Sequence, residues 1–324
     1  MQERKGNGMG KFGWCFIGAG GIAYTVFNDT KEINIVSVYS RTYEKAVNFA
    51  KEAGAAAYKT FEEAVTAPGV DAVYIAVPHV EHFPCTMKAL ELGKPVLCEK
   101  PIAVRSWQIK KMIEEARKSD LFLMEAMWVR FNPIIKTVRS WIEKGEIGEV
   151  RHMTADFSDS RPVDFSKDYY RPEMSGGGLL DMGVYPLAFS RMVYGEHPAD
   201  VHAFGKVVNG VDTRLTAVLE YSDNRTAAIY TGLDVSSKWE AVIYGSKGVI
   251  TVPEFWKARE ATLIRADREI LKTSRDGCVG WGYQMRAVEE LISGGAKESM
   301  DMPLEDSLSI SQTMDALLGQ VGVV

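Results

Sequence analysis

The feature that most restricts the fold of this chain is a glycine-rich turn that follows a short apolar run. Residues 12–17 are mainly apolar and aromatic, as a buried parallel strand requires. The turn that follows, Gly18 to Ala23, reads GAGGIA and has the form GxGxxA. Its first two glycines let the backbone approach a pyrophosphate, and the small Ala23 lets a helix pack closely on the strand. Alone this signal is weak, because many glycine-rich turns bind no ligand.

A second apolar run, residues 33–39, ends at about the distance where a dinucleotide-binding fold places the residue that contacts the ribose. NAD-preferring sites usually carry Asp or Glu at that point, whereas this chain has Ser40 and Arg41. A serine and an arginine suit a 2′-phosphate, so the sequence favours NADP as the cofactor, with NAD as the alternative. A solvated surface arginine just after a strand would show the same pattern.

Further apolar runs alternate with helical patterns as far as residue 126, which predicts a parallel, doubly wound sheet of the α/β class. Ligands of such sheets bind beyond the carboxyl ends of the strands, so the residues at these ends are candidate contacts. The predicted strands after residue 39 are 72–77, 95–98 and 121–126, and the helices between them are 82–92 and 106–119. The candidate contacts at the strand ends are Gly18, Ser40, Pro78 and Lys100.

The second half shows a different pattern, which predicts an α+β domain on an open, mainly antiparallel sheet. Many of its strand-like runs alternate apolar and polar residues, as strands with one face on a core do. A chain of 324 residues exceeds a usual single core, so we expect two domains. We place a flexible N-terminus at 1–11, a dinucleotide-binding domain at 12–130 and a domain for substrate binding and oligomerisation at 131–324. The predicted strands are 150–157, 201–208, 213–221, 226–233, 238–244 and 248–252, and the helices are 134–144, 179–194, 283–293 and 304–318.

The predicted helices would cover one face of that sheet and leave the other face for solvent or a partner. In a cytosolic enzyme an exposed sheet face is more often a subunit interface than a ligand site. We therefore expect a homo-oligomer, either a dimer or a tetramer, that forms through this sheet.

Composition argues against several classes of protein. A formal net charge of −5 and the lack of a dense lysine or arginine cluster argue against nucleic acid as a partner. No apolar stretch reaches membrane-spanning length, and the polar start of the chain does not resemble a signal peptide. The cysteines lack paired spacing, so we expect free thiols and a cytoplasmic location. They are Cys15, Cys85, Cys98 and Cys278.

The histidines predict no metal site. His79 and His82 lie three residues apart, but no carboxylate or cysteine completes a known zinc pattern around them. We expect both to have roles in a loop and at a helix start near the cofactor.

The segment 176–185, GGGLLDMGVY, carries the strongest catalytic signal. Positions four apart share one face of a helix, so Asp181 and Tyr185 would project together after a flexible glycine run. Lys100 ends an apolar run upstream, and a lysine beside a tyrosine forms a proton-transfer pair for carbonyl chemistry. Purely structural roles are the alternative: a strand-end lysine, a helix-start acid and a packing tyrosine.

Two further features bear on the site. Gly183 and Pro186 both disfavour a regular helix interior, which predicts a kink beside Tyr185 that either aims the phenol or is merely tolerated. Residues 158–170 are rich in Asp, Ser and Tyr, as a sugar-binding loop or an ordinary surface loop would be.

Four motifs, in this order and spacing, resemble the glucose-fructose oxidoreductase and inositol dehydrogenase (Gfo/Idh/MocA) superfamily over nearly the whole chain. They are GAGGIA at 18–23, AVP at 76–78 with His82, GKPVLCEKP at 93–101 and GGGLLDMGVY at 176–185. The resemblance implies a Rossmann domain followed by an α+β domain whose open sheet commonly mediates dimerisation. It also implies that Lys100, the lysine of the EKP motif, contacts substrate and nicotinamide.

A tyrosine at position 185, where many members carry histidine, is similar to the dimeric dihydrodiol dehydrogenases, NADP-dependent xylose dehydrogenases and glucose-fructose oxidoreductases. The run MEAMWVRF at 124–131 resembles the same subgroup, although packing at a hinge is the commoner role for residues such as its Trp128 and Arg130. Arg171, in the sequence RPE, also fits the subgroup as a substrate or supporting contact. In this subgroup the tyrosine is taken as the general acid and base.

We therefore expect an NADP-dependent oxidoreductase that takes a hydride from a secondary alcohol or hemiacetal carbon of a sugar, cyclic polyol or trans-dihydrodiol, while Tyr185 takes the proton. Lys100 would stabilise the phenolate and lower the pKa of Tyr185. The alternatives are a non-catalytic sensor that binds NADP, and a reductase of a ketose or dicarbonyl. The expected catalytic residues are Lys100, Asp181 and Tyr185; the cofactor contacts are Gly18, Gly20, Gly21, Ile22, Ser40, Arg41, Pro78, His82, Glu99 and Lys100; the substrate contacts are Lys100, Trp128, Arg130, Arg171, Asp181 and Tyr185.

Overall fold

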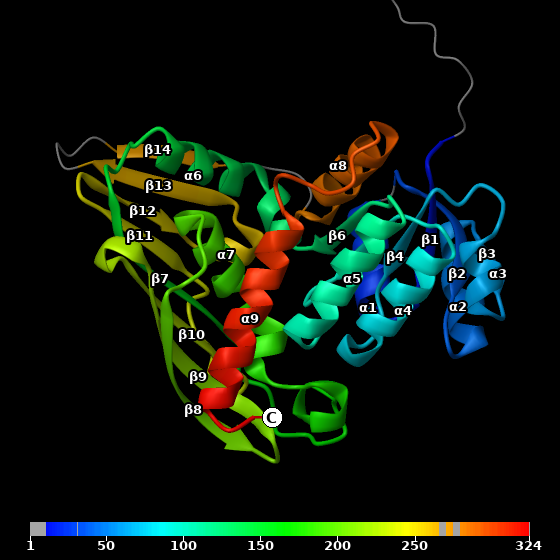
Figure 1. Cartoon of the computed structure of the whole chain (residues 1–324), viewed down its shortest axis with the longest axis horizontal. Coiled ribbons are helices and arrows are strands. Elements are labelled where there is room, and N and C mark those ends of the chain that lie inside the picture. The colour runs from blue at the N-terminus through cyan, green and yellow to red at the C-terminus, as the bar shows by residue number, and fades with distance from the viewer. Residues whose placement is uncertain (1–10, 31, 266–269, 275–278, 324) are drawn as a thin grey trace, which may run out of the picture.

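A computed structural model describes residues 11–30, 32–265, 270–274 and 279–323 and shows two sheets with helices packed around them (Figure 1). The segment expected to be a flexible N-terminus lies outside the described residues, apart from residue 11, and so does Cys278. Among the described residues, no helix is both long and apolar enough to cross a membrane.

The first sheet is entirely parallel, with strand order β3-β2-β1-β4-β5-β6. This confirms the predicted doubly wound α/β fold, including the strand reversal beside which such sheets bind ligands. The strands are β1 (Gly13–Ile17), β2 (Asn34–Tyr39), β3 (Ala56–Tyr58), β4 (Ala72–Ile75), β5 (Val96–Glu99) and β6 (Leu123–Ala126). The helices are α1 (Gly21–Asp29), α2 (Tyr43–Ala53), α3 (Phe61–Val65), α4 (His79–Glu91) and α5 (Ser106–Lys118).

Helices cover both faces of this sheet, which is why its central strands are apolar throughout. Every residue of β1, β4, β5 and β6 is buried. On β1, Phe16 packs in one core with α1 and α2, whereas Ile17 packs in the other core with α4 and α5. Successive side chains of a strand point to opposite faces, so a strand covered on both sides cannot show apolar and polar alternation.

The second sheet has the strand order β14-β13-β12-β11-β7-β10-β9-β8 and is antiparallel except where β10 pairs with β7. This confirms the predicted open, mainly antiparallel sheet. Its strands are β7 (Val150–Ser158), β8 (Asp200–Val208), β9 (Val211–Glu220), β10 (Thr226–Gly232), β11 (Ala241–Gly245), β12 (Gly248–Val252), β13 (Glu260–Arg265) and β14 (Ile270–Ser274). The helices of this half are α6 (Pro133–Glu143), α7 (Val184–Tyr194), α8 (Trp281–Ser293) and α9 (Leu304–Gln320), and short helical turns are η1 (Trp128–Phe131), η2 (Asp168–Tyr170), η3 (Pro172–Met174), η4 (Leu179–Gly183), η5 (Ser222–Asn224) and η6 (Phe255–Lys257).

One face of the second sheet is covered and the other is open. Along β9 buried residues alternate with exposed ones, and Arg214, Thr216, Val218 and Glu220 all lie on the open side. Helix α7 packs against β7 and β10 on the covered side. The sheet also extends beyond the predicted last strand, because β13 and β14 add two antiparallel strands at its edge.

The two C-terminal helices contact the first half of the fold. The Asp29 carboxylate at the end of α1 accepts backbone N–H bonds from Val279, Gly280 and Gly282, at the start of α8. The Trp14 indole donates to Glu289 of α8 across 2.8 Å. Helix α9, red in Figure 1, packs against both α5 and α7. The division at residue 130 therefore stays a prediction, since α8 and α9 contact elements on both sides of it.

Candidate active site

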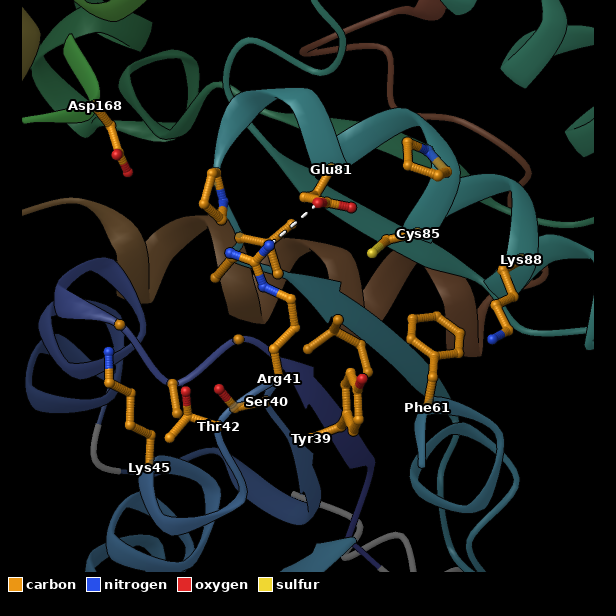
Figure 2. A pocket seen from close by; sticks show the side chains of 18 residues that line it. Tyr39, Ser40, Arg41, Thr42, Lys45, Phe61, Glu81, Cys85, Lys88 and Asp168 are labelled. Atoms are coloured by element: carbon orange, nitrogen blue, oxygen red, sulfur yellow. Dashed lines mark hydrogen bonds and ion pairs between the residues drawn. The ribbon is translucent and has the colours of Figure 1, made fainter. Parts of the chain in front are cut away.

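A cavity of about 540 Å³ lies beyond the carboxyl ends of β1, β2 and β4 (Figure 2). Half of the predicted cofactor contacts line it. These are Gly18, Gly20, Ser40, Arg41 and Pro78.

The glycine turn leaves the end of α1 open toward this cavity. Gly18 has a φ of +106°, and a Cβ on it would lie 2.1 Å from the Ala76 carbonyl oxygen, so only glycine fits there. A Cβ on Gly20 or Gly21 would meet nothing within 4 Å. Helix α1 begins without a side-chain cap, which leaves its first N–H groups for a ligand. Uncapped amides at a helix N-terminus suit a pyrophosphate.

Side chains after β2 supply positive charge at the edge of the cavity. The Arg41 guanidinium lies 3.3 Å from the Glu81 carboxylate of α4, and its side chain is 68% exposed. Thr42 and Lys45 line the same cavity beside Ser40 (Figure 2). Thr42 and Lys45 were not predicted as contacts, although Lys45 lies in the first turn of α2, directly after Arg41. Two cations with two hydroxyl groups suit a phosphate.

A second cavity, of about 180 Å³, adjoins the first. Val77, Pro78 and Asp168 line both cavities, whereas His79 and Asp181 line only the second. Asp168 belongs to η2, so the segment 158–170 does reach the site. The pair of cavities gives room for a dinucleotide and, next to it, a small ring.

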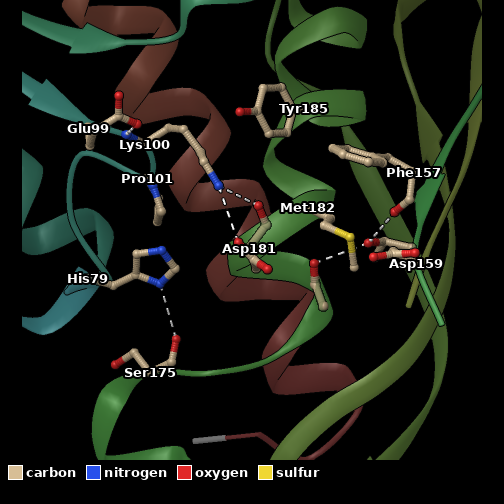
Figure 3. Close-up of polar contacts among 12 residues, drawn as sticks. His79, Glu99, Lys100, Pro101, Phe157, Asp159, Ser175, Asp181, Met182 and Tyr185 are labelled. Atoms are coloured by element: carbon tan, nitrogen blue, oxygen red, sulfur yellow. Dashed lines mark hydrogen bonds and ion pairs between the residues drawn. The ribbon is translucent and has the colours of Figure 1, made fainter. Parts of the chain in front are cut away.

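Lys100, Asp181 and Tyr185 come together beside the second cavity, although only Asp181 lines it and the other two line neither cavity (Figure 3). The Lys100 Nζ donates to the backbone oxygen of Asp181 across 2.6 Å and lies 3.4 Å from its Oδ1. The same Nζ lies 5.1 Å from the centre of the Tyr185 ring. Burial lowers the pKa of Lys100, but the acidic groups of Tyr185, Asp181 and Glu99 outweigh it and raise that pKa. Lys100 therefore stays charged at neutral pH.

Asp181 lies between two cations. Arg161 Nη1 donates to Asp181 Oδ2 across 2.6 Å, opposite the Lys100 contact. Burial raises the pKa of Asp181, but Lys100 and Arg161 together hold it well below its usual range. An ionised, doubly paired carboxylate orients its neighbours rather than taking a proton. Sequence reasoning missed Arg161, because a loop arginine gives no sign of its partner.

Tyr185 receives a hydrogen bond from Trp128, whose indole Nε1 lies 3.0 Å from the phenol oxygen. Trp128 itself is fully buried and stacks on Trp281 with ring centres 4.4 Å apart. Burial raises the pKa of Tyr185 to about 12, while the Lys100 charge and the Trp128 hydrogen bond act in the opposite direction. Lys100 thus lowers the pKa of Tyr185, as expected, but burial raises that pKa by more.

Where Gly183 and Pro186 predict a kink, the structure has a π-helical turn. The turn η4 spans Leu179–Gly183 and carries Asp181, and α7 continues from it with Tyr185. A π-helical turn adds one residue to the usual helical spacing, so the two side chains take a different angular relation from a regular helix.

Two arginines predicted as substrate contacts bind other groups and line neither cavity. The Arg130 Nη2 donates to the Ala188 carbonyl across 2.8 Å and to Asp306 across 3.0 Å. The Arg171 Nε donates to Glu173 across 2.8 Å. Arg130 therefore ties η1 to α7, which carries Ala188, and to α9, which carries Asp306.

Several predicted cofactor contacts also line neither cavity. The two nitrogens of His82 lie 2.7 Å from the Pro101 carbonyl and 2.8 Å from the Val77 carbonyl, and burial lowers its pKa to about 3. The buried Glu99 accepts a hydrogen bond from Tyr74 across 2.6 Å and another from the Lys100 backbone across 3.2 Å. Both residues shape the loop that carries Lys100. Gly21, Ile22 and Lys100 itself also lie outside the lining of the first cavity.

No metal-binding cluster of three or more His, Cys, Asp or Glu side chains occurs among the residues that the structure describes.

Comparisons with known proteins match both halves of the chain. Residues 12–127 match the family model described as "Oxidoreductase family, NAD-binding Rossmann fold", and residues 135–251 match the GFO/IDH/MocA C-terminal domain. A trans-1,2-dihydrobenzene-1,2-diol dehydrogenase from Xenopus laevis is 34% identical, with 90% of each chain covered. The mouse (Mus musculus) protein of the same name is 30% identical, with 96% of this chain and 97% of that protein covered.

Solved structures share the fold at lower sequence identity. A 3-ketoreductase mutant from Actinomadura kijaniata, in complex with TDP-benzene and NADP, is 24% identical with a TM-score of 0.85. An aldose-aldose oxidoreductase from Caulobacter crescentus, complexed with glycerol, is 22% identical with a TM-score of 0.87. Each comparison covers 96% of this chain and 98% of the other chain.

Proposed function

This chain belongs to the Gfo/Idh/MocA oxidoreductase family, and from that premise we propose that it is an NADP-dependent dehydrogenase of a neutral, ring-shaped sugar, cyclic polyol or trans-dihydrodiol. The observation that carries the proposal is the convergence of Lys100, Asp181 and Tyr185 beside a cavity that adjoins the dinucleotide-sized cavity. The relatives named dihydrodiol dehydrogenases support a diol substrate.

The first cavity fits the cofactor by its chemistry. Gly18 and Gly20 would hold the pyrophosphate at the start of α1, and Ser40, Arg41, Thr42 and Lys45 would hold the 2′-phosphate of the adenosine ribose. When bound there, NADP supplies the hydride acceptor or donor. The proposed division at residue 130 would leave this site with the first domain and the substrate contacts with the second.

Tyr185 would exchange a proton with the substrate oxygen. In the oxidative direction its phenolate accepts the hydroxyl proton, and in the reductive direction its phenol returns that proton to the alkoxide. Lys100 stabilises the negative charge on either oxygen, and the Trp128 N–H stabilises the phenolate. Asp181, fixed by Arg161, holds the Lys100 ammonium in place. The same residues serve oxidation and the reduction of a ketose or dicarbonyl.

The charges around the second cavity favour a neutral substrate. Its two nearby cations, Lys100 and Arg161, are already bound to Asp181, and Asp168 adds a further carboxylate to the lining. A phosphorylated or carboxylated substrate would have to compete with Asp181 for these cations. A volume of about 180 Å³ suits a single six-membered ring with hydroxyl groups.

The open face of the second sheet supports a proposal of a homo-oligomer. On β8 the side chain of Phe204 is 82% exposed, and on β9 Val218 is 40% exposed. Apolar side chains on an open sheet face are typical of a surface that a second copy covers.

The test is a nicotinamide absorbance assay with NADP⁺ or NAD⁺ and a panel of D-xylose, D-glucose, myo-inositol and trans-1,2-dihydrobenzene-1,2-diol. We expect turnover with NADP⁺ that Tyr185→Phe abolishes. Tight NADPH binding without turnover in either direction would instead support a sensor.

A further inference from the structure

We infer that Asp212 is a positioning residue for the reaction: its buried carboxyl group holds the turn from which Asp181 and Tyr185 project. The inference rests on the proposed function, because it concerns the placement of those two side chains. Asp212 lies near the start of β9, in the second sheet, and is 0% exposed. Its Oδ2 accepts a hydrogen bond from the Leu179 backbone N–H across 2.7 Å.

This hydrogen bond supplies a cap that the turn lacks. The residue before η4 is Gly178, which has no side chain to accept a bond from the first N–H groups. An uncapped helix start leaves several N–H groups without partners, and a buried one is costly. Asp212 provides the acceptor from a strand that lies 33 residues further along the chain. Capping by a distant carboxylate fixes the turn relative to the sheet.

The glycine run before the turn is shaped around this carboxyl group. A Cβ on Gly177 would lie 2.0 Å from Asp212 Oδ1, and Gly177 has a φ of +120°. A Cβ on Gly178 would lie 3.4 Å from Asp212 Oδ2 and 3.2 Å from the Gly232 Cα. Gly177 therefore leaves the room that the Asp212 carboxyl group occupies, and any side chain at this position would collide with it.

A second strand secures the turn from the same sheet. The hydroxyl oxygen of Thr231, on β10, lies 3.1 Å from the Gly178 carbonyl oxygen and 2.9 Å from the Phe157 carbonyl oxygen. Its proton is donated toward these two acceptors. A Cβ on Gly183, at the other end of the turn, would lie 3.0 Å from Thr231 Cγ2. The turn is thus bound at its start by β9 and packed along its length on β10.

The hydrogen bond from Leu179 to Asp212 lies within one helical turn of the catalytic groups. Two residues after the Leu179 amide, the backbone oxygen of Asp181 accepts the Lys100 Nζ at 2.6 Å. A shift of the turn therefore moves Asp181 and the start of α7 with Tyr185, and it changes the contact that Lys100 makes with Asp181. A misplacement of about 1 Å in an active site can cost about a hundredfold in rate.

The test compares Asp212→Leu, which has similar bulk and no acceptor, with Asp212→Asn, whose amide oxygen can accept the same bond. We expect Asp212→Leu to lower kcat about a hundredfold and to leave the KM for NADP⁺ unchanged, because the cofactor cavity lies on the other sheet. Asp212→Asn should stay close to wild type. Thr213→Val is the matched control, since this neighbouring buried hydroxyl binds the Lys206 carbonyl instead of the turn. If Asp212→Leu fails to fold, Asp212→Ser takes its place, because its hydroxyl group is too short to reach Leu179.

Hydrogen exchange gives a readout that needs no substrate. Amides in residues 177–185 should exchange faster in Asp212→Leu than in wild type, and at the wild-type rate in Asp212→Asn. Unchanged exchange in Asp212→Leu, or an equal loss of kcat in Thr213→Val, would overturn the role of Asp212. If the wild-type protein turns over no alcohol of the panel, the proposed function fails, and the exchange result alone decides whether Asp212 holds the turn.

Discussion

The indole N–H of Trp128 donates a hydrogen bond to the phenol oxygen of Tyr185 across 3.0 Å, and both side chains are buried. Because this donor occupies one position on the oxygen, the phenol proton must point elsewhere. The bond becomes stronger when the phenol ionises, since hydrogen bonds to a charged acceptor exceed those to a neutral one.

Trp128→Phe should therefore slow the reaction and move its pH dependence upward. A hydrogen bond to a charged group is worth about 1.5–3 kcal/mol, so we expect kcat for alcohol oxidation to fall about tenfold to a hundredfold. The check is a pH–rate profile of the variant beside wild type. Trp281→Phe is the matched control, because Trp281 stacks on Trp128 and its buried indole nitrogen has no hydrogen-bond partner among the described residues. A Trp128→Phe profile equal to that of wild type would contradict the role.

Alcohol oxidation should accelerate as the pH rises. Burial raises the pKa of Tyr185 to about 12, so below that pH the phenol form dominates and the phenolate base grows about tenfold per pH unit. We expect kcat/KM for oxidation to rise from neutral to alkaline pH, and carbonyl reduction, which uses the phenol form, to lack this rise. Tyr185→Phe should remove the pH-dependent part and lower the rate by about 10²–10⁴. An oxidation rate that is flat from neutral to alkaline pH would exclude Tyr185 as the base.

Arg161→Leu should weaken catalysis by releasing Asp181. Without the guanidinium, the carboxylate loses its 2.6 Å partner and can turn away from Lys100. We expect kcat/KM to fall about tenfold, as for the loss of one charge-assisted hydrogen bond. Arg139→Leu provides the comparison, since that arginine binds Glu143 across 2.8 Å and lines neither cavity. Equal losses in the two variants would show that Arg161 has no specific effect on Asp181.

Arg41→Ala should change cofactor preference. The KM for NADP⁺ should rise about tenfold to a hundredfold through loss of a charged phosphate contact, while the KM for NAD⁺ changes little. Lys45→Ala should act in the same direction. Lys88 lines the same cavity but pairs with Glu62 across 2.6 Å. Lys88→Ala therefore tests whether the loss of any positive charge in this cavity raises the KM for NADP⁺. Equal increases in both KM values after Arg41→Ala would contradict 2′-phosphate recognition.

Asp212→Asn should flatten the dependence of stability on pH. Burial raises the pKa of Asp212 from 3.8 to about 7, so the native state binds a proton that the unfolded chain releases. The free energy of unfolding therefore falls as pH rises from about 4 to about 7, by at most about 4 kcal/mol. Urea unfolding at about pH 5 and about pH 8 measures this difference, which should shrink in the variant. If the difference in unfolding free energy between the two pH values were unchanged in Asp212→Asn, groups other than Asp212 would cause the pH dependence.

Local sequence signals account for much of the first sheet. The GxGxxA turn and the alternation of strand and helix predicted β1, β2, β4, β5 and β6 in their order. The short β3 was missed, because its sequence Ala56–Tyr58 is only three residues long and only half-buried. In the second sheet β13 and β14 were missed, and no local signal shows that β10 runs parallel to β7.

In the site, too, local motifs predicted some residues, whereas contacts between residues far apart in the chain could not be predicted. Motif spacing brought Lys100, Asp181 and Tyr185 into one hypothesis, and in the structure Lys100 contacts both Asp181 and the Tyr185 ring. Arg130 was assigned to the substrate, but its partner Asp306 lies 176 residues away and cannot be inferred from the chain around it. Asp212 gave no sequence signal at all, since an aspartate at the start of a strand does not show which turn it binds.

The contacts of α8 and α9 with the first half also set an order of events during protein synthesis. A ribosome completes both sheets before it makes the helices that bind Asp29, Trp14 and α5. Until then the surfaces of α1 and α5 that α8 and α9 cover stay open to solvent. The N-terminal half therefore reaches its final packing only once residues 281–320 have been synthesised.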